Sequence, residues 1–197
     1  MKIFDKWDVE GIKVKDPGLE KYINLTPVLV PKTGGIHASH QFHKSKVNIV
    51  ERLMNKLMVP GHRGKKHFIS SGRCVGKKVN AYKIVKGCFE KIEKRTKKNP
   101  IEVLVKAIEN SALREEIASY QVGGIIVRRA VITSPQRRVD LALSNIVQAA
   151  YRECFGKKES IVDALTKEIV GAYNNDASKS QAIKEKERIE REAEGAR

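Results

Sequence analysis

Apolar residues recur at helical spacing along most of the chain from residue 46 onward. Val50, Leu53, Met54, Leu57 and Met58 follow the i, i+3, i+4, i+7 pattern of one helix face, and Pro60–Gly61 ends it. Similar apolar stripes predict helices over residues 81–92, 100–108, 135–150, 161–169 and 179–197. Capping residues mark several starts, because Asn99 and Ser134 each precede a proline and Ser160 stands three residues before an acid.

The apolar period changes between residues 115 and 133. β-branched and aromatic residues dominate there, and Gly123–Gly124 supplies the positive φ that a tight hairpin turn needs. A lone hairpin is marginally stable. Residues 119–139 carry no acid and four arginines, namely Arg128, Arg129, Arg137 and Arg138. We therefore expect an arm that projects from a helical body and gains its order from a partner.

The first 45 residues follow neither period. Pro17, Pro27, Pro31 and the Gly34–Gly35 pair interrupt any long helix. We predict an N-terminal extension over residues 1–45 that wraps the body or a bound partner, and a helical domain over residues 46–197. The fold class is mainly α, a bundle of five to six helices with one projecting β-hairpin arm at about residues 115–133.

The positive charge is concentrated in one part of the chain. The 39 Lys and Arg against 23 Asp and Glu give a net charge of +16. Residues 44–98 hold 17 of the bases and only three of the acids, Glu51, Glu90 and Glu93. Such clustering favours a polyanionic partner, because neutralised phosphates release counterions. A solvated face is the alternative, although solubility alone does not require clustering.

Aromatic residues are 6% of the chain and form no base-stacking pattern. We therefore expect contacts to phosphates and to the shape of a nucleic acid.

Nothing in the sequence indicates a membrane protein or a secreted one. There is no apolar run of about 18 residues, and the first residues lack the pattern of a signal peptide. Cys74, Cys88 and Cys154 are odd in number and widely spaced, which argues against a disulfide framework. We expect a cytoplasmic protein without a membrane partner.

Residues 61–78 raise the possibility of a nucleotide-binding loop. This stretch, GHRGKKHFISSGRCVGKK, holds four glycines and no carboxylate. A phosphate loop needs four residues between its glycines and then Lys-Ser/Thr. Here three residues separate Gly72 from Gly76, and Lys78 occupies the hydroxyl position. The pattern therefore argues against nucleotide hydrolysis, and the bases remain candidates for contact with a phosphate backbone.

The histidines are the other candidate chemistry. His37, His40 and His43 are spaced by three, with His62 and His67 downstream, but no Cys-x-x-Cys pair accompanies them. Polar contact with RNA or solvent is the simpler interpretation. No Ser/His/Asp or Cys/His arrangement is visible. We predict no catalytic residue, metal, cofactor or small-molecule substrate.

Five strings along the chain resemble the small-subunit ribosomal protein S-seven family in its archaeal and eukaryotic form. They are NIVERLMNKLM (48–58), GKKVNAYKIV (76–85), NPIEVLVKAIENSALREE (99–116), RRAVITSPQRRVDLAL (128–143) and SKSQAIKEKERIE (178–190). The resemblance implies a structural protein of the subunit head. It would bind the 3′ major domain of small-subunit rRNA, nucleate head assembly, and lie near exit-site tRNA, the mRNA path and other head and platform proteins.

The resemblance also places individual residues. Lys77 and Lys78 match the basic pair that opens the second family helix, and Arg137 and Arg138 match the pair after the hairpin. The concentration of positive charge adds further bases to these two pairs. The predicted rRNA-binding set is Arg63, Lys65, Lys66, Arg73, Lys77, Lys78, Lys83, Arg137 and Arg138. The predicted arm set, facing tRNA, mRNA or rRNA, is Gln121, Gly123, Gly124, Arg128 and Arg129. The alternatives are a stand-alone or autoregulatory RNA-binding protein and, more remotely, a metal- or nucleotide-dependent enzyme.

Overall fold

The architecture is a helical body with one long hairpin. A computed structural model describes residues 1–59 and 75–197. Over these residues the chain forms α1 (Pro17–Glu20), α2 (Ile49–Leu57), α3 (Lys78–Thr96), α4 (Pro100–Ser111), α5 (Pro135–Cys154), α6 (Ile161–Tyr173) and α7 (Gln181–Glu194), with 3-10 turns at Ile36–Ser39 and His43–Lys46. The strands are β1 (Glu115–Val122) and β2 (Ile125–Ile132). The predicted fold class is confirmed, and the short α1 is an addition to it.

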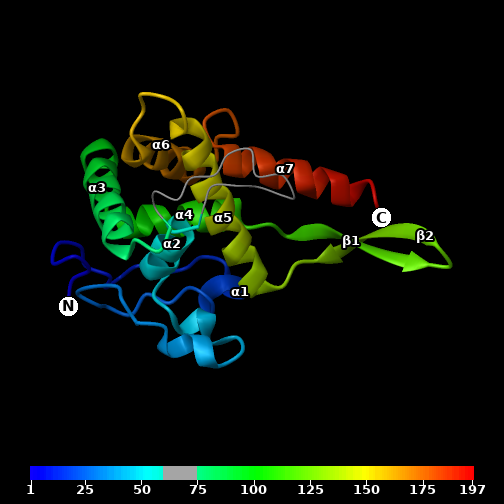
Figure 1. The fold of residues 1–197 in the computed structure, drawn as a ribbon, viewed down its shortest axis with the longest axis horizontal. Coiled ribbons are helices and arrows are strands. Elements are labelled where there is room, and N and C mark those ends of the chain that lie inside the picture. The colour runs from blue at the N-terminus through cyan, green and yellow to red at the C-terminus, as the bar shows by residue number, and fades with distance from the viewer. Residues whose placement is uncertain (60–74) are drawn as a thin grey trace.

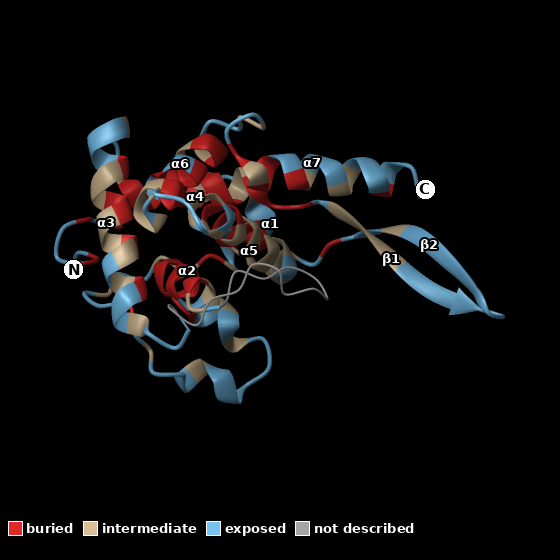
Figure 2. Ribbon diagram, turned by 45° about the horizontal axis from the view of Figure 1, so that its top comes forward, coloured by how far each residue is buried: buried red, intermediate tan, exposed pale blue. Residues whose placement is uncertain are grey.

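The core lies where α4, α5 and α6 pack against one another. Figure 2 shows buried residues concentrated on these helices. Leu104 and Ile108 of α4, Leu143 and Ile146 of α5, and Ile169 of α6 are all fully buried. Because these side chains lie three or four residues apart on each helix, the apolar stripes of the sequence become the core.

Two of the three predicted helix caps form hydrogen bonds. The Asn99 side chain accepts from the Ile101 amide at 3.0 Å, and the Ser160 hydroxyl accepts from the Val162 amide at 3.3 Å. Ser134 stands at the N-cap of α5, but its side chain makes no capping hydrogen bond. Pro135 at the first turn starts that helix, since its φ is already helical.

The hairpin is the arm that the glycine pair predicted. Val122 pairs with Ile125 across a two-residue turn, in which Gly123 has φ +55° and Gly124 has φ +87°. A turn with both central residues at positive φ matches the twist of the flanking strands. Figure 1 shows the two strands extending beyond the helical body, on the side where α7 ends.

The base of the arm is held by its own chain, whereas its outer half is exposed. Glu115 of β1 accepts from Arg197 at 2.7 Å, and the Ala130 amide donates to the Ala196 carbonyl at 3.4 Å. From Ser119 to Arg129 every residue of the hairpin is exposed. The C-terminal end of the chain thus supports the arm only near its origin.

The N-terminal segment packs into the body. Phe4 and Trp7 are 3% and 4% exposed, and their rings meet Phe89 of α3 edge to face at centroid distances of 6.0 and 5.5 Å. The Trp7 indole nitrogen also donates to Glu93 at 3.1 Å. Phe4 and Trp7 therefore pack against α3, while the N-terminal extension over residues 1–45 and the division of the chain at residue 45 stay predictions.

Candidate nucleic-acid interface

The start of α3 presents exposed lysines beside a buried apolar stripe. Ala81, Val85 and Cys88 face the core, which leaves Lys77 and Lys83 on the outside of the helix. Neither lysine forms an ion pair with a carboxylate of the described residues. Both ammonium groups are therefore available to a phosphate backbone.

Lys78 has a different role from its neighbour Lys77. Its ammonium group forms an ion pair with Glu51 of α2, which is 2% exposed. The Glu51 carboxylate also accepts from the Thr33 amide at 2.9 and 3.0 Å. Lys78 therefore joins α3 to α2 and to the N-terminal segment, because it compensates a buried negative charge.

The two arginines after the hairpin also differ in burial, although both form ion pairs. Arg137 is exposed and donates to both oxygens of Glu116 at 2.6 and 2.8 Å, which raises the pKa of its guanidinium. Arg138 is largely buried and donates to the Leu113 carbonyl at 2.9 Å and to Asp16 at 2.8 Å. Arg137 presents charge at the base of the arm, whereas Arg138 ties α5 to the N-terminal segment.

Asp16 is the carboxylate of this second pair. Partial desolvation acts to raise its pKa, but the hydrogen bonds from Arg138 and the Gly18 amide hold the pKa below the ordinary value. The carboxylate also caps α1 through the Gly18 amide at 2.9 Å. The Arg138–Asp16 contact is therefore between two charged groups at neutral pH.

The arm carries its predicted residues on an exposed surface. Arg128 pairs in register with Ser119 and Arg129 with Ala118, so the two arginines point to opposite faces of the ribbon. Both are exposed, without an ion pair to a described carboxylate, and Gln121 near the turn is exposed as well. Val122, Ile125 and Ile126 beside them are 56–70% exposed. The outer arm thus combines positive charge with apolar surface.

Four of the predicted contacts fall outside the described residues. These are Arg63, Lys65, Lys66 and Arg73, together with His62, His67 and Cys74. The segment that precedes them is the helix α2, which confirms the helix that the apolar pattern predicted. A nucleotide-binding loop would instead follow a buried strand. The predicted roles of these four bases stay predictions.

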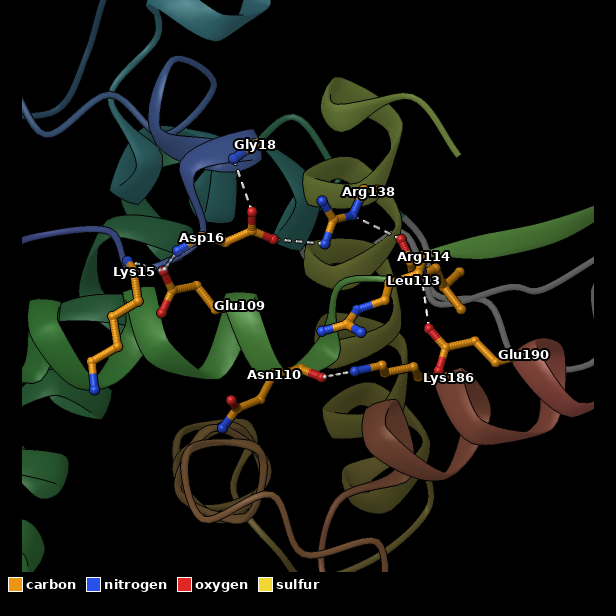
Figure 3. Close-up of polar contacts among 10 residues, drawn as sticks. All are labelled: Lys15, Asp16, Gly18, Glu109, Asn110, Leu113, Arg114, Arg138, Lys186 and Glu190. Carbon is orange, nitrogen blue, oxygen red and sulfur yellow. Dashed lines mark hydrogen bonds and ion pairs between the residues drawn. The ribbon is translucent and has the colours of Figure 1, made fainter. Parts of the chain in front are cut away.

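One basic recess was missed from the sequence. It lies at the base of the arm and is lined by residues that include Asp16, Lys106, Arg114, Thr133, Arg138 and Lys186. We call it the hairpin-base recess. Figure 3 shows how the polar side chains from the N-terminal segment, α4, α5 and α7 meet there. No local string could reveal it, because its lining comes from segments that lie far apart in the chain and contribute at most three residues each.

The histidines and Cys88 are the remaining candidates for metal binding or nucleophilic chemistry. The rings of His40 and His43 lie 4.8 Å apart, yet no group of three or more metal-ligating side chains occurs among residues 1–59 and 75–197. Cys88 is buried, and desolvation raises the pKa of its thiol to about 12, so this thiol is not a nucleophile at neutral pH. No helix in the described part of the chain has the length and hydrophobicity to cross a bilayer.

A helical body, a lysine-bearing helix face and an arginine-bearing arm are features expected of a protein that binds nucleic acid. The family described as Ribosomal protein S7p/S5e matches residues 19–197. The chain belongs to this family.

Curated relatives match the chain over almost its whole length. A protein of Nanoarchaeum equitans named small ribosomal subunit protein uS7 is 53% identical, covering 100% of this chain and 99% of the relative. Proteins of the same name from Archaeoglobus fulgidus and Methanothermobacter thermautotrophicus are 49% and 48% identical. They cover 99% and 98% of this chain and 94% and 98% of the relatives. The resemblance inferred from the five strings is confirmed.

Proposed function

We propose that this chain is a structural, non-catalytic constituent of the small ribosomal subunit in the cytoplasm and binds its rRNA. The observation that carries the proposal is full-length similarity to archaeal proteins of that name, combined with exposed bases that have no carboxylate partner in the described residues. Lys77, Lys83, Arg128 and Arg129 are among those bases and are the ones in the predicted contact sets. They lie on two separate elements, α3 and the arm.

The two elements suit different parts of an RNA partner. The α3 face is fixed to the core by its apolar stripe, so it offers charge at set positions to one folded region, for which we propose the 3′ major domain of the rRNA. Binding there early in assembly would nucleate the subunit head. The arm projects and is exposed on both faces, which suits a site where exit-site tRNA, mRNA or neighbouring head and platform proteins approach.

A comparison of Lys77→Ala with Lys78→Ala tests the assignment of the α3 face. Lys77→Ala should leave stability unchanged and lower the slope of log affinity against log salt for an rRNA 3′-domain fragment by about one unit. Lys78→Ala should instead lower the free energy of unfolding by about 1–3 kcal/mol, because Glu51 loses its buried cation. Filter binding over a salt series and urea unfolding measure the two effects.

Lys158→Ala is the matched control, since it removes one exposed lysine from the loop between α5 and α6. An equal loss of slope in Lys77→Ala and Lys158→Ala would contradict a specific role for the α3 face. Co-sedimentation addresses the subunit itself: the chain should remain with small subunits through a high-salt wash. Recovery with free RNA alone would favour the stand-alone RNA-binding alternative.

A further inference from the structure

The hairpin-base recess has the dimensions of a ligand site. It encloses about 610 Å³ between the N-terminal segment, the end of α4, the start of α5 and α7, which is within the usual range for ligand pockets. Elements that lie far apart in the chain form its walls and are joined by direct contacts. Arg138 donates to Asp16 at 2.8 Å, and Lys186 donates to the Asn110 carbonyl at 2.8 Å. These contacts fix the walls without a ligand.

The charge that lines the recess is positive. Five of the lining residues are basic and two are acidic. Both acids are already engaged: Asp16 binds Arg138, and Glu109 accepts from the Lys15 and Asp16 amides at 2.5 and 3.1 Å. The carboxylates therefore hold the wall, and the balance of the lining charge is left for an anion.

Arg114 is a cation of this lining that has no ion pair with a carboxylate of the described residues. Its backbone amide donates to Glu190 at 2.9 Å, which fixes the residue at the start of the arm. Its guanidinium forms no ion pair with a described carboxylate, and Figure 3 shows it directed into the space between Arg138 and Lys186. Lys106 lies on the same lining, with its ammonium 4.7 Å from the Tyr173 ring centroid.

Thr133 provides an independent indication of a ligand. It is 3% exposed and lines the recess, and its hydroxyl has no hydrogen-bond partner among the described residues. A buried hydroxyl without a partner is costly, by about 1–3 kcal/mol. A ligand oxygen that accepts from this hydroxyl would remove that cost.

We propose that the hairpin-base recess binds a phosphate group, held by the Arg114 guanidinium and the Thr133 hydroxyl. Phosphate is the anion that suits this lining, because a guanidinium group can donate two parallel hydrogen bonds to phosphate oxygens. The hydroxyl can donate to a further phosphate oxygen. The phosphate belongs either to an RNA backbone or to a free phosphorylated molecule. The RNA source rests on the proposed function, whereas the recess itself does not.

Equilibrium dialysis of the full chain against radiolabelled inorganic phosphate, at constant ionic strength in chloride, tests the recess. Thr133→Val should bind phosphate about tenfold more weakly, the size expected for losing a hydrogen bond to a charged group. Its melting temperature without phosphate should not fall, because the hydroxyl had no partner. Arg114→Gln should lower the affinity for phosphate by a similar factor. Thr133→Ser, which keeps the hydroxyl, and Arg152→Gln, which removes an exposed arginine of α5, should bind as the wild type does.

Saturating rRNA 3′-domain fragment distinguishes the two sources. Loss of phosphate uptake in its presence assigns the recess to an RNA phosphate, and retained uptake assigns it to a free phosphorylated ligand. Wild-type affinity in Thr133→Val, or no saturable uptake by the wild type, would overturn the recess proposal even if rRNA binding is intact. Saturable phosphate uptake in a chain that does not bind rRNA would overturn the proposed function and leave the recess standing.

Discussion

The sequence predicts that both the N-terminal segment and the hairpin arm lie outside the helical bundle, yet their apolar residues differ in burial. Phe4 and Trp7 are almost fully buried against α3, whereas Ile125 and Ile126 near the tip of the arm are 70% and 68% exposed. Apolar residues in an irregular segment can pack on their own chain or remain for another molecule. We therefore expect Phe4 and Trp7 to stabilise the body, whereas the apolar residues of the outer arm are left uncovered by the described part of the chain.

The largest expected effect comes from Trp7→Ala. Removing a buried indole should lower the free energy of unfolding by about 3–5 kcal/mol, which corresponds to a fall on the order of 10 °C in melting temperature. Tyr120→Ala on the exposed half of β1 is the control and should change the melting temperature little. Thermal unfolding followed by circular dichroism measures both. Similar losses in the two variants would remove the contrast between the segment and the arm.

Asp140→Asn should have the next largest effect. Asp140 of α5 accepts from Lys44 of the N-terminal segment at 2.9 Å and from Arg52, a 3% exposed residue of α2, at 3.1 Å. The variant leaves Arg52 with a buried charge and without its carboxylate. We expect a loss of about 3 kcal/mol at neutral pH, the lower end for breaking a buried ion pair.

The pH dependence of this loss has a defined sign. Burial acts to raise the pKa of Asp140, but the hydrogen bond from Lys44 and the charge of Arg52 hold it below its ordinary value of 3.8. A depressed pKa adds stability above the unfolded value that is lost as pH falls through the folded value. The difference between wild type and Asp140→Asn in urea unfolding should therefore shrink below about pH 3.8. A difference that is constant with pH would contradict the ion pair.

The smallest effect on stability is expected from the double variant Arg128→Ala, Arg129→Ala. Both side chains are exposed on the arm, so unfolding should change by no more than about 0.5 kcal/mol. The salt slope for rRNA binding should fall by about one to two units. The double lysine variant keeps the charge and should restore the slope. A large loss of melting temperature would show that the arm is packed against the body.

Local signals predicted most of the secondary structure correctly. Asn99–Pro100 starts a helix because the cap and the proline act within one turn, and Gly123–Gly124 predicts a hairpin because both residues have positive φ. The packing of Phe4 on Phe89 could not be predicted in this way. Nothing in the first residues specifies which distant helix they contact.

The candidate interface could be predicted only as a set of charges. Lys77 and Lys78 are adjacent and identical in type, but α2 presents a buried carboxylate to only one of them. Arg137 and Arg138 are both ion-paired, Arg137 with Glu116 of the arm and Arg138 with Asp16, which lies 122 residues away in the chain. Sequence shows where positive charge is placed along the chain. Which charges are already neutralised depends on contacts between distant segments.

The contact between Phe4 and Phe89 has a consequence for the order in which the chain can fold during synthesis. Phe4 is made before α3 and cannot complete its packing until Phe89 has followed it, 85 residues later. At typical elongation rates of about 5–20 residues per second, Phe4 and Trp7 wait several seconds without their final neighbours. During that interval these two aromatic side chains lack the ring of Phe89 that buries them in the folded chain.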